Sequence, residues 1–289
     1  MHPRAEAARA AWRLVEPVHA VTYFSPEPIA ALREAGYRGF WMGYFAGRAA
    51  PLGPVPAEVV HALFHNFALA HVARALPDAW SFAPPAAALE ARLKGSVAAL
   101  RRHLDAAGVD ETVLGRAADL AERAAFAAPL EGRALFAANL ALPVPSGALA
   151  RLWHAATLLR EHRGDGHVVA LTAAGIGGRE AHVLHALATG TPAEVYRTAR
   201  NIEDTEWNDL LDGLRGRGLV DAGGGLTARG QASKDRVEQL TDDLAATAYA
   251  ALQDQDIDDL LAALGPVRAA VVAAGEIPVR SPMGLDLSR

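Results

Sequence analysis

The 289-residue chain contains no cysteine, only two lysines and no apolar run long enough to span a bilayer. Without thiols it can form neither a disulfide nor a thiolate metal site, and a cysteine nucleophile is excluded. The N-terminal residues also lack the apolar core of a signal peptide. These absences predict a cytoplasmic protein with no membrane partner.

The second half of the chain has an excess of acidic residues. Residues 1–147 hold 14 basic and 13 acidic side chains, whereas residues 148–289 hold 14 basic and 20 acidic ones, which together give the net charge of -5. A nucleic-acid-binding surface needs an excess of cations to neutralise phosphates. The second half therefore lacks the overall charge that favours DNA.

Recognisable cofactor and metal motifs are missing as well. There is no glycine-rich dinucleotide motif after a strand, no P-loop and no nucleophile elbow. His61 and His65 have the four-residue spacing of a metal-binding pair, but the residues between them supply no acid. His182 and His185 are three apart. We interpret both pairs as exposed or core-edge imidazoles and predict neither a metal nor a cofactor.

The sequence does contain an internal repeat with an offset of 135 to 139 residues, about half the chain. Three short segments recur, with residues 31–39, 56–59 and 143–146 returning as residues 170–178, 192–195 and 278–281. Two prolines and a glycine between Leu142 and Gly147 mark a boundary. The repeat predicts two domains, 1–147 and 148–289, packed as an intramolecular pseudo-dimer with a natural ligand groove between unlike copies.

Both halves have mainly helical periodicity. In the first half we expect a helix from Ala5 that stops near Pro17, and one long helix from Val59 to Leu76. In the second half we expect four helices between Ala148 and Arg217, followed by a β-hairpin over residues 218–228 and a further helix. Short apolar pairs around Gly223-Gly224-Gly225 are typical of such a hairpin. The predicted fold is mainly α, internally duplicated, with two winged-helix-like halves.

Two family resemblances follow from these motifs. The helix order, the phrase Arg217-Gly218-Leu219-Val220 and the following Leu226-Thr227-Ala228-Arg229-Gly230 resemble the MarR-type winged helix-turn-helix regulators over residues 148–245. The stretches His19–Phe24 and Gly39–Gly53 resemble an actinobacterial family of SalK-type helix-turn-helix proteins over nearly the whole chain. The SalK-type resemblance implies a helix-turn-helix fold, and it implies no particular activity.

The predicted recognition helix is poorly suited to DNA. A helix-turn-helix places the start of its second helix against base edges, with cations beside it on the phosphates. Here that helix start is acidic, and no lysine or arginine lies between Arg200 and Arg215. Acids at a helix start are also ordinary capping residues, and Arg215, Arg217 and Arg229 flank the wing. We expect little or no DNA binding. The acidic residues are Glu203, Asp204, Glu206 and Asp209.

The first half carries 14 of the 18 aromatic residues. We predict that it binds a small aromatic or anionic organic ligand, with stacking and hydrogen bonds from Tyr23, Trp41 and Tyr44. Arg48, in an otherwise apolar stretch, would contact an anion of the ligand unless Glu16, Glu27 or Glu58 neutralises it. His65 and Asn66 would orient polar groups. The alternative is that these aromatics only fill a core.

Two other functions stay open from the sequence. A ligand-responsive transcriptional regulator is the first alternative. The second is an enzyme in which His19, next to Tyr23, acts as an acid or base near neutral pH. The oligomeric state is either a monomer that behaves as a pseudo-dimer or a homodimer.

Overall fold

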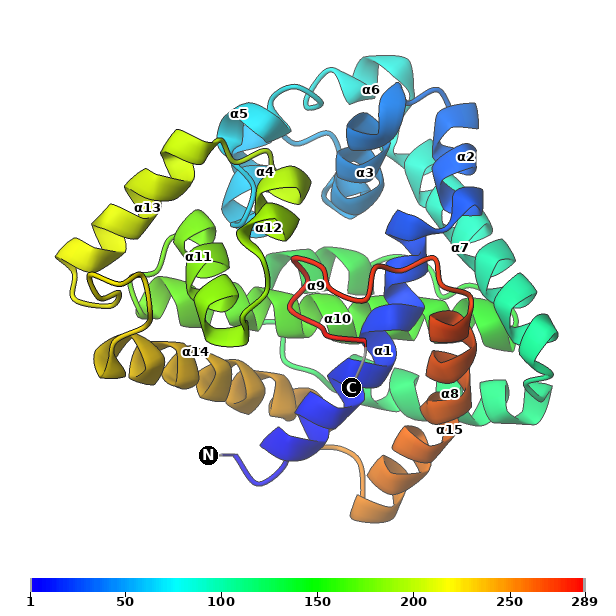
Figure 1. The fold of residues 1–289 in the computed structure, drawn as a ribbon. Coiled ribbons are helices and arrows are strands. Elements are labelled where there is room, and N and C mark those ends of the chain that lie inside the picture. Colours follow the sequence, from blue (N-terminus) through cyan, green and yellow to red (C-terminus); the bar gives the residue numbers. More distant parts are fainter. Residues whose placement is uncertain (1, 288–289) are drawn as a thin grey trace.

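The computed structural model describes residues 2–287, which fold almost entirely as helices (Figure 1). No helix in this part of the chain combines the length and apolar character needed to cross a bilayer. The first half comprises α1 (Ala5–Phe24), α2 (Pro26–Glu34), α3 (Gly39–Ala49), the 3-10 turn η1 (Ala50–Leu52), α4 (Ala57–Phe64), α5 (Leu69–Val72), α6 (Ala79–Phe82), α7 (Pro85–Ala107), α8 (Glu111–Phe126) and α9 (Ala134–Leu140). The second half comprises α10 (Ala148–Ala173), α11 (Gly178–Thr189), α12 (Ala193–Arg200), α13 (Asp204–Gly216), α14 (Ala228–Ala246), η2 (Thr247–Tyr249) and α15 (Asp254–Ala273).

Helix α10 is the centre of the fold. It runs across the middle of the molecule in Figure 1 and packs against α1, α7, α8, α9 and α14. Most of its residues are buried on every side, including the polar residues His154, Thr157, Glu161 and Asp165. A helix buried all round cannot send its polar side chains to water. These side chains therefore need partners inside the protein.

The hydrophobic residues form three clusters. One lies along α1, α7, α8, α10 and α15 and draws on both halves of the sequence. A second is confined to residues 32–135, where α3 to α7 meet. A third is confined to residues 170–237, where α11 to α14 meet. Two lobes, one from each half, thus stand on a shared layer, as Figure 1 shows for α3–α6 and α11–α13.

The second lobe contains a helix-turn-helix arrangement. Helix α12 ends at Asn201, whose φ of 51° reverses the chain, and α13 begins three residues later. After α13, one antiparallel bridge joins Val220 and Leu226, and Thr227 donates its backbone N–H to Leu219. Residues 2–287 contain no assigned strand, so the expected hairpin over 218–228 is present only as this single-bridge turn.

Two helix boundaries differ from the sequence expectation. Pro17 does not end α1, which continues to Phe24, because every residue from Val15 to Tyr23 is buried and packing outweighs the lost hydrogen bond. The single helix expected from Val59 to Leu76 is also wrong. It breaks at His65, which has φ 51°, and the chain resumes as α5.

Close packing of α2 on α7 depends on Gly95, and this predicts a stability difference between two glycines. A Cβ on Gly95 would overlap the backbone of Pro28, whereas a Cβ on Gly115, inside α8, meets nothing within 4 Å. We expect Gly95→Ala to lower the free energy of unfolding by about 1–3 kcal/mol through overpacking. Gly115→Ala should raise it by up to about 1 kcal/mol through helix propensity. Urea denaturation measures both, and equal effects would contradict the packing argument.

Candidate functional site

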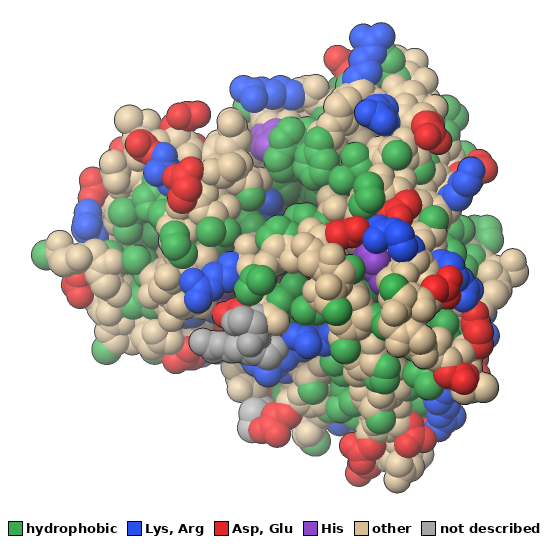
Figure 2. Space-filling view, turned by 45° about the vertical axis from the view of Figure 1, so that its right-hand side comes forward, with side chains coloured by type: hydrophobic (Ala, Val, Ile, Leu, Met, Phe, Trp, Pro, Cys, Tyr) green, Lys and Arg blue, Asp and Glu red, His purple; other side chains and the backbone are tan. Residues whose placement is uncertain are grey.

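A cavity of about 880 Å³ lies between the two lobes. Its walls come from α1, α3, α4, α10, α11, α12, α14 and the C-terminal segment from Pro278 to Asp286. That volume is in the range of small-molecule sites. In the space-filling view, one face of the molecule is hollowed, with hydrophobic side chains along the hollow (Figure 2).

One wall of the cavity is aromatic. The rings of Tyr23 and Tyr44 lie 4.9 Å apart between centroids, and Trp41 meets Tyr44 edge-on at 5.5 Å. Phe64 and Phe67 continue this wall from α4 and the turn after it. Offset and edge-on pairs of this kind hold aromatic rings in fixed positions. The wall presents flat apolar faces and the polar tips of two tyrosines.

A buried ion network supports this wall. Glu161 on α10 accepts hydrogen bonds from Arg160 at 2.8 Å and from Arg48 on α3 at 3.4 Å. Arg160 also reaches Glu16 on α1 at 3.4 Å, and Glu16 accepts from the indole of Trp12 at 3.1 Å. Although burial by itself would raise the pKa of Glu161, Arg160 and Arg48 hold it at about 2. The network contains two carboxylates and two guanidinium groups, so its charges cancel.

The cavity as a whole has an excess of positive charge. Nine basic side chains line it against four acidic ones. The basic residues are Arg9, Arg13, Arg48, Arg160, Arg163, Arg200, Lys234, Arg268 and Arg280, and the acidic ones are Glu16, Asp165, Glu238 and Asp286. Glu161 and Asp242 pair with some of these arginines, which still leaves more cations than anions. Burial raises the pKa of Asp165 to about 6, so this carboxyl loses its charge only in mild acid.

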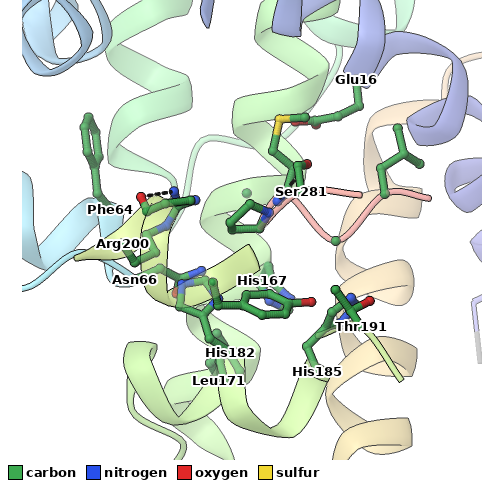
Figure 3. Close-up of a pocket in the computed structure, with 18 of the residues that line it drawn as sticks. Glu16, Phe64, Asn66, His167, Leu171, His182, His185, Thr191, Arg200 and Ser281 are labelled. Carbon is green, nitrogen blue, oxygen red and sulfur yellow. Dashed lines mark hydrogen bonds between the residues drawn. The ribbon is translucent and has the colours of Figure 1, made fainter. Parts of the chain in front are cut away.

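Three histidines add neutral polar groups to the cavity wall. His167, His182 and His185 line the cavity from α10 and α11 (Figure 3). Burial lowers the pKa of His167 and His185 to about 4, and it lowers the pKa of His182 well below its ordinary value. All three are therefore neutral at physiological pH and can donate or accept a hydrogen bond without adding charge.

His19 lies in a buried hydrogen-bonded chain beside the cavity. Its Nδ1 is 2.9 Å from the hydroxyl of Thr157, and its Nε2 is 2.8 Å from the hydroxyl of Tyr23. The Thr157 hydroxyl donates to the carbonyl of Trp153, so Nδ1–H must donate to Thr157 and Nε2 must accept from Tyr23. Burial keeps the pKa of His19 well below its usual value, and Tyr23 alone of the three lines the large cavity.

The structure brings most of the predicted site residues together. Tyr23, Trp41, Tyr44, Arg48 and Asn66 all line the cavity. His65 does not. It caps α4, its Nε2 is 3.3 Å from the carbonyl of Ile176, and its own carbonyl lies where a Cβ on Gly178 would be. Arg48 forms its ion pair with Glu161 and not with Glu16, Glu27 or Glu58, the three glutamates considered from the sequence.

Sequence reasoning missed the partner residues on α10 and α12. Arg160, Glu161 and Arg200 come from the second half, which carries few aromatics, and none of the three belongs to a motif that the sequence analysis singled out as a ligand site. One available signal was that charged residues interrupt the apolar start of the helix beginning at Ala148. Among residues 2–287 there is no group of three or more His, Cys, Asp or Glu side chains arranged to hold a metal ion.

Comparison with known proteins yields one match. The profile described as a helix-turn-helix family matches residues 8–278. No curated protein and no solved structure matches the chain.

The ion network predicts that Glu161→Gln is strongly destabilising. The amide would leave Arg160 and Arg48 without their shared counter-charge, and breaking a buried pair in this way costs about 3–5 kcal/mol. The control is Glu111→Gln, which removes an exposed pair with Arg101 and should cost no more than about 1 kcal/mol. Chemical denaturation at pH 7.5 measures both. Equal losses of unfolding free energy in the two variants would show that the buried network stabilises the fold no more than an exposed ion pair does.

The buried histidines predict a loss of stability in mild acid. Burial lowers the pKa of His162 to about 3, whereas the unfolded chain takes up a proton near pH 6.5. The unfolded state therefore binds more protons below pH 6.5, and the free energy of unfolding falls as pH falls. His162→Phe keeps a ring against Phe136 and removes this titration. Its loss of stability between pH 6 and 4 should be shallower by about 1.4 kcal/mol per pH unit. Parallel curves would contradict this.

Proposed function

The chain belongs to the helix-turn-helix family, and we propose that it uses this scaffold to bind a small aromatic or anionic organic ligand between its two halves. The single observation that carries the proposal is the cavity of about 880 Å³ with one aromatic wall and an excess of cations. The chain as a whole has a net charge of -5, but the side chains that line the cavity have an excess of positive charge. Such a field attracts anionic ligands into a low-dielectric site.

We further propose that the two halves are copies of one winged-helix-like unit. Helices α4 and α12 are each eight residues long, and each follows a proline, Pro56 or Pro192. Each is followed by a residue with φ 51°, His65 or Asn201, which are the two non-glycine residues of positive φ among residues 2–287. The shared central core with one lobe on each side supports an intramolecular pseudo-dimer of domains 1–147 and 148–289.

The likeness to MarR-type and SalK-type proteins belongs to the same proposal. In the second half, a long helix, three shorter helices, a tight turn at residues 218–228 and a further long helix follow one another in the order that the MarR resemblance implies. The first half has α5 and α6, each four residues long, where the second half has α13. A degenerate first copy of this kind frees its aromatic residues to line a ligand site.

DNA binding by α13 would be weak on this proposal. Its acidic residues Glu203, Asp204 and Asp209 are exposed, and the cations nearest them are already paired, Arg197 with Asp204 and Arg179 with Glu206. Arg215 and Arg217 pair with Asp212 and Glu180. The surface offers phosphates few free cations. The family match nevertheless favours a ligand-responsive transcriptional regulator as the second candidate function.

An enzyme that uses His19 receives less support from the geometry. Both ring nitrogens of His19 are hydrogen-bonded to protein groups, and a molecule in the large cavity would meet Tyr23 before the imidazole. Any proton would have to pass through the Tyr23 hydroxyl. We therefore propose ligand binding, and not catalysis by His19, as the function of the cavity.

Binding can be followed through the indole of Trp41, which lines the cavity. Native mass spectrometry of the purified protein should reveal a co-purifying small molecule. Returning that molecule to the stripped protein should change tryptophan fluorescence. Trp41→Phe should remove most of the change because its ring is on the binding wall. Trp80→Phe is the control, since Trp80 donates to the carbonyl of Val55 outside the cavity. Trp12 also lines the cavity, so a response that survives in Trp41→Phe would place the molecule away from the aromatic wall, and one that survives in a Trp12→Phe, Trp41→Phe double variant would place it outside the cavity.

A mobility-shift assay at low salt separates the two candidate functions. We expect no retained complex between the protein and its own promoter, with or without the co-purified molecule, because α13 presents carboxylates to the phosphates. A sequence-specific complex that the ligand releases would establish the regulator instead.

A further inference from the structure

Arg200 is a partly buried arginine of the cavity whose charge no carboxylate of residues 2–287 neutralises; Arg13 and Arg280 also line the cavity without an ion pair in this part of the chain, but both are exposed. Arg48 and Arg160 share Glu161, and Arg163 and Arg9 share Asp242. Arg200, the last residue of α12, forms no ion pair with any carboxylate of residues 2–287. A cation in this position, partly buried and unpaired, has a large electrostatic gain available from an anion.

The contacts of Arg200 leave its guanidinium available to a ligand. One Nη donates to the neighbouring carbonyl of Ala199 at 3.1 Å, the group lies over the ring of Phe67 at 4.3 Å, and its Nε has no acceptor. Arg92 offers a contrast, because it also lacks a carboxylate but donates to Gly47 and Asn139 at 3.0 and 2.9 Å. Internal carbonyl oxygens therefore satisfy Arg92 more fully than Arg200.

The neighbours of Arg200 in the cavity wall are neutral donors and aromatic rings. Figure 3 shows Arg200, Asn66 and His182 on one side of the pocket, with Ser281 across from them. His182 is buried and neutral, and its Nε2 has no hydrogen-bond partner. Tyr44 and Phe67 continue the wall from here. The group provides one formal positive charge, several uncharged hydrogen-bonding atoms and flat apolar surface.

We propose that Arg200 binds the carboxylate of an aromatic acid whose ring lies against Tyr44, Trp41 and Phe67. This assignment rests on the proposed function and specifies it. One unpaired guanidinium matches a single negative charge, and its planar fork suits a carboxylate. A phosphate dianion would require a second free cation beside Arg200, but the arginines that act on it most strongly, Arg48, Arg160 and Arg179, are each paired with a glutamate. The ligand class is therefore a small aromatic monoacid.

The experiment compares an acid with its neutral isostere. The probes are 4-hydroxybenzoate, 4-hydroxybenzamide and 4-hydroxyphenyl phosphate, titrated calorimetrically into the stripped full-length protein at pH 7.5. We expect the carboxylate to bind at least tenfold more tightly than the amide and than the phosphate. Equal binding of acid and amide would overturn the proposal without any mutation, and so would failure of the acid to bind. Tightest binding by the phosphate would replace the monoacid with a phosphate ester.

Variants then locate the anion contact. Arg200→Met should weaken 4-hydroxybenzoate at least tenfold and leave 4-hydroxybenzamide within about threefold. Arg200→Lys keeps the charge without the planar fork, and its affinity should fall between those of Met and Arg. The matched control is Arg197→Met on the same helix, because Arg197 pairs with Asp204 and Glu194 and does not line the cavity. It should bind as the unmodified protein does, and a loss as large as that of Arg200→Met would overturn the assignment.

The two proposals can fail separately. A neutral co-purifying molecule that quenches Trp41 in both the unmodified protein and Arg200→Met would keep the binding function and remove the role of Arg200. Absence of any bound molecule together with no response to the three probes would remove both.

Discussion

The fold depends on the way α10 neutralises its own buried charges. A helix surrounded by protein on every side must find partners for each polar group it carries, since no water is available to do so. Glu161 on α10 pairs with Arg48 on α3. Arg160, also on α10, pairs with Glu16 on α1. Helix α10 is thereby held against α1 and α3, which come from the other half of the sequence, and all three helices line the cavity. The position of the aromatic wall follows from this network.

The same network explains why the cavity has two electrostatic regions. Around Glu161 every guanidinium has a counter-charge, so that region is rigid and nearly neutral. At the end of α12, Arg200 contacts a carbonyl and an aromatic ring but no carboxylate of residues 2–287. Arg200 also directly precedes the turn at Asn201 that leads into α13. A residue of the cavity wall is therefore the direct sequence neighbour of the turn in the helix-turn-helix segment of the second lobe.

Within that segment, the side-chain chemistry of α13 differs from that of a DNA reader. Asp204 and Glu206 pair with Arg197 and Arg179, so the acidic helix start stabilises its own lobe through ion pairs. A family named for its helix-turn-helix can retain this geometry for packing while charge decides what binds to it.

Helical periodicity and the aromatic bias of the first half were both determined by the sequence, because they follow from the spacing and type of neighbouring residues. Local reasoning also grouped Tyr23, Trp41 and Tyr44 with Arg48. Only the tertiary structure decided that Arg48 is paired with Glu161, which lies 113 residues away, and that Arg200 forms no ion pair with a carboxylate of the described residues. Whether a buried charge is available to a ligand depends on long-range contacts, and these are set by how helices distant in the chain pack together.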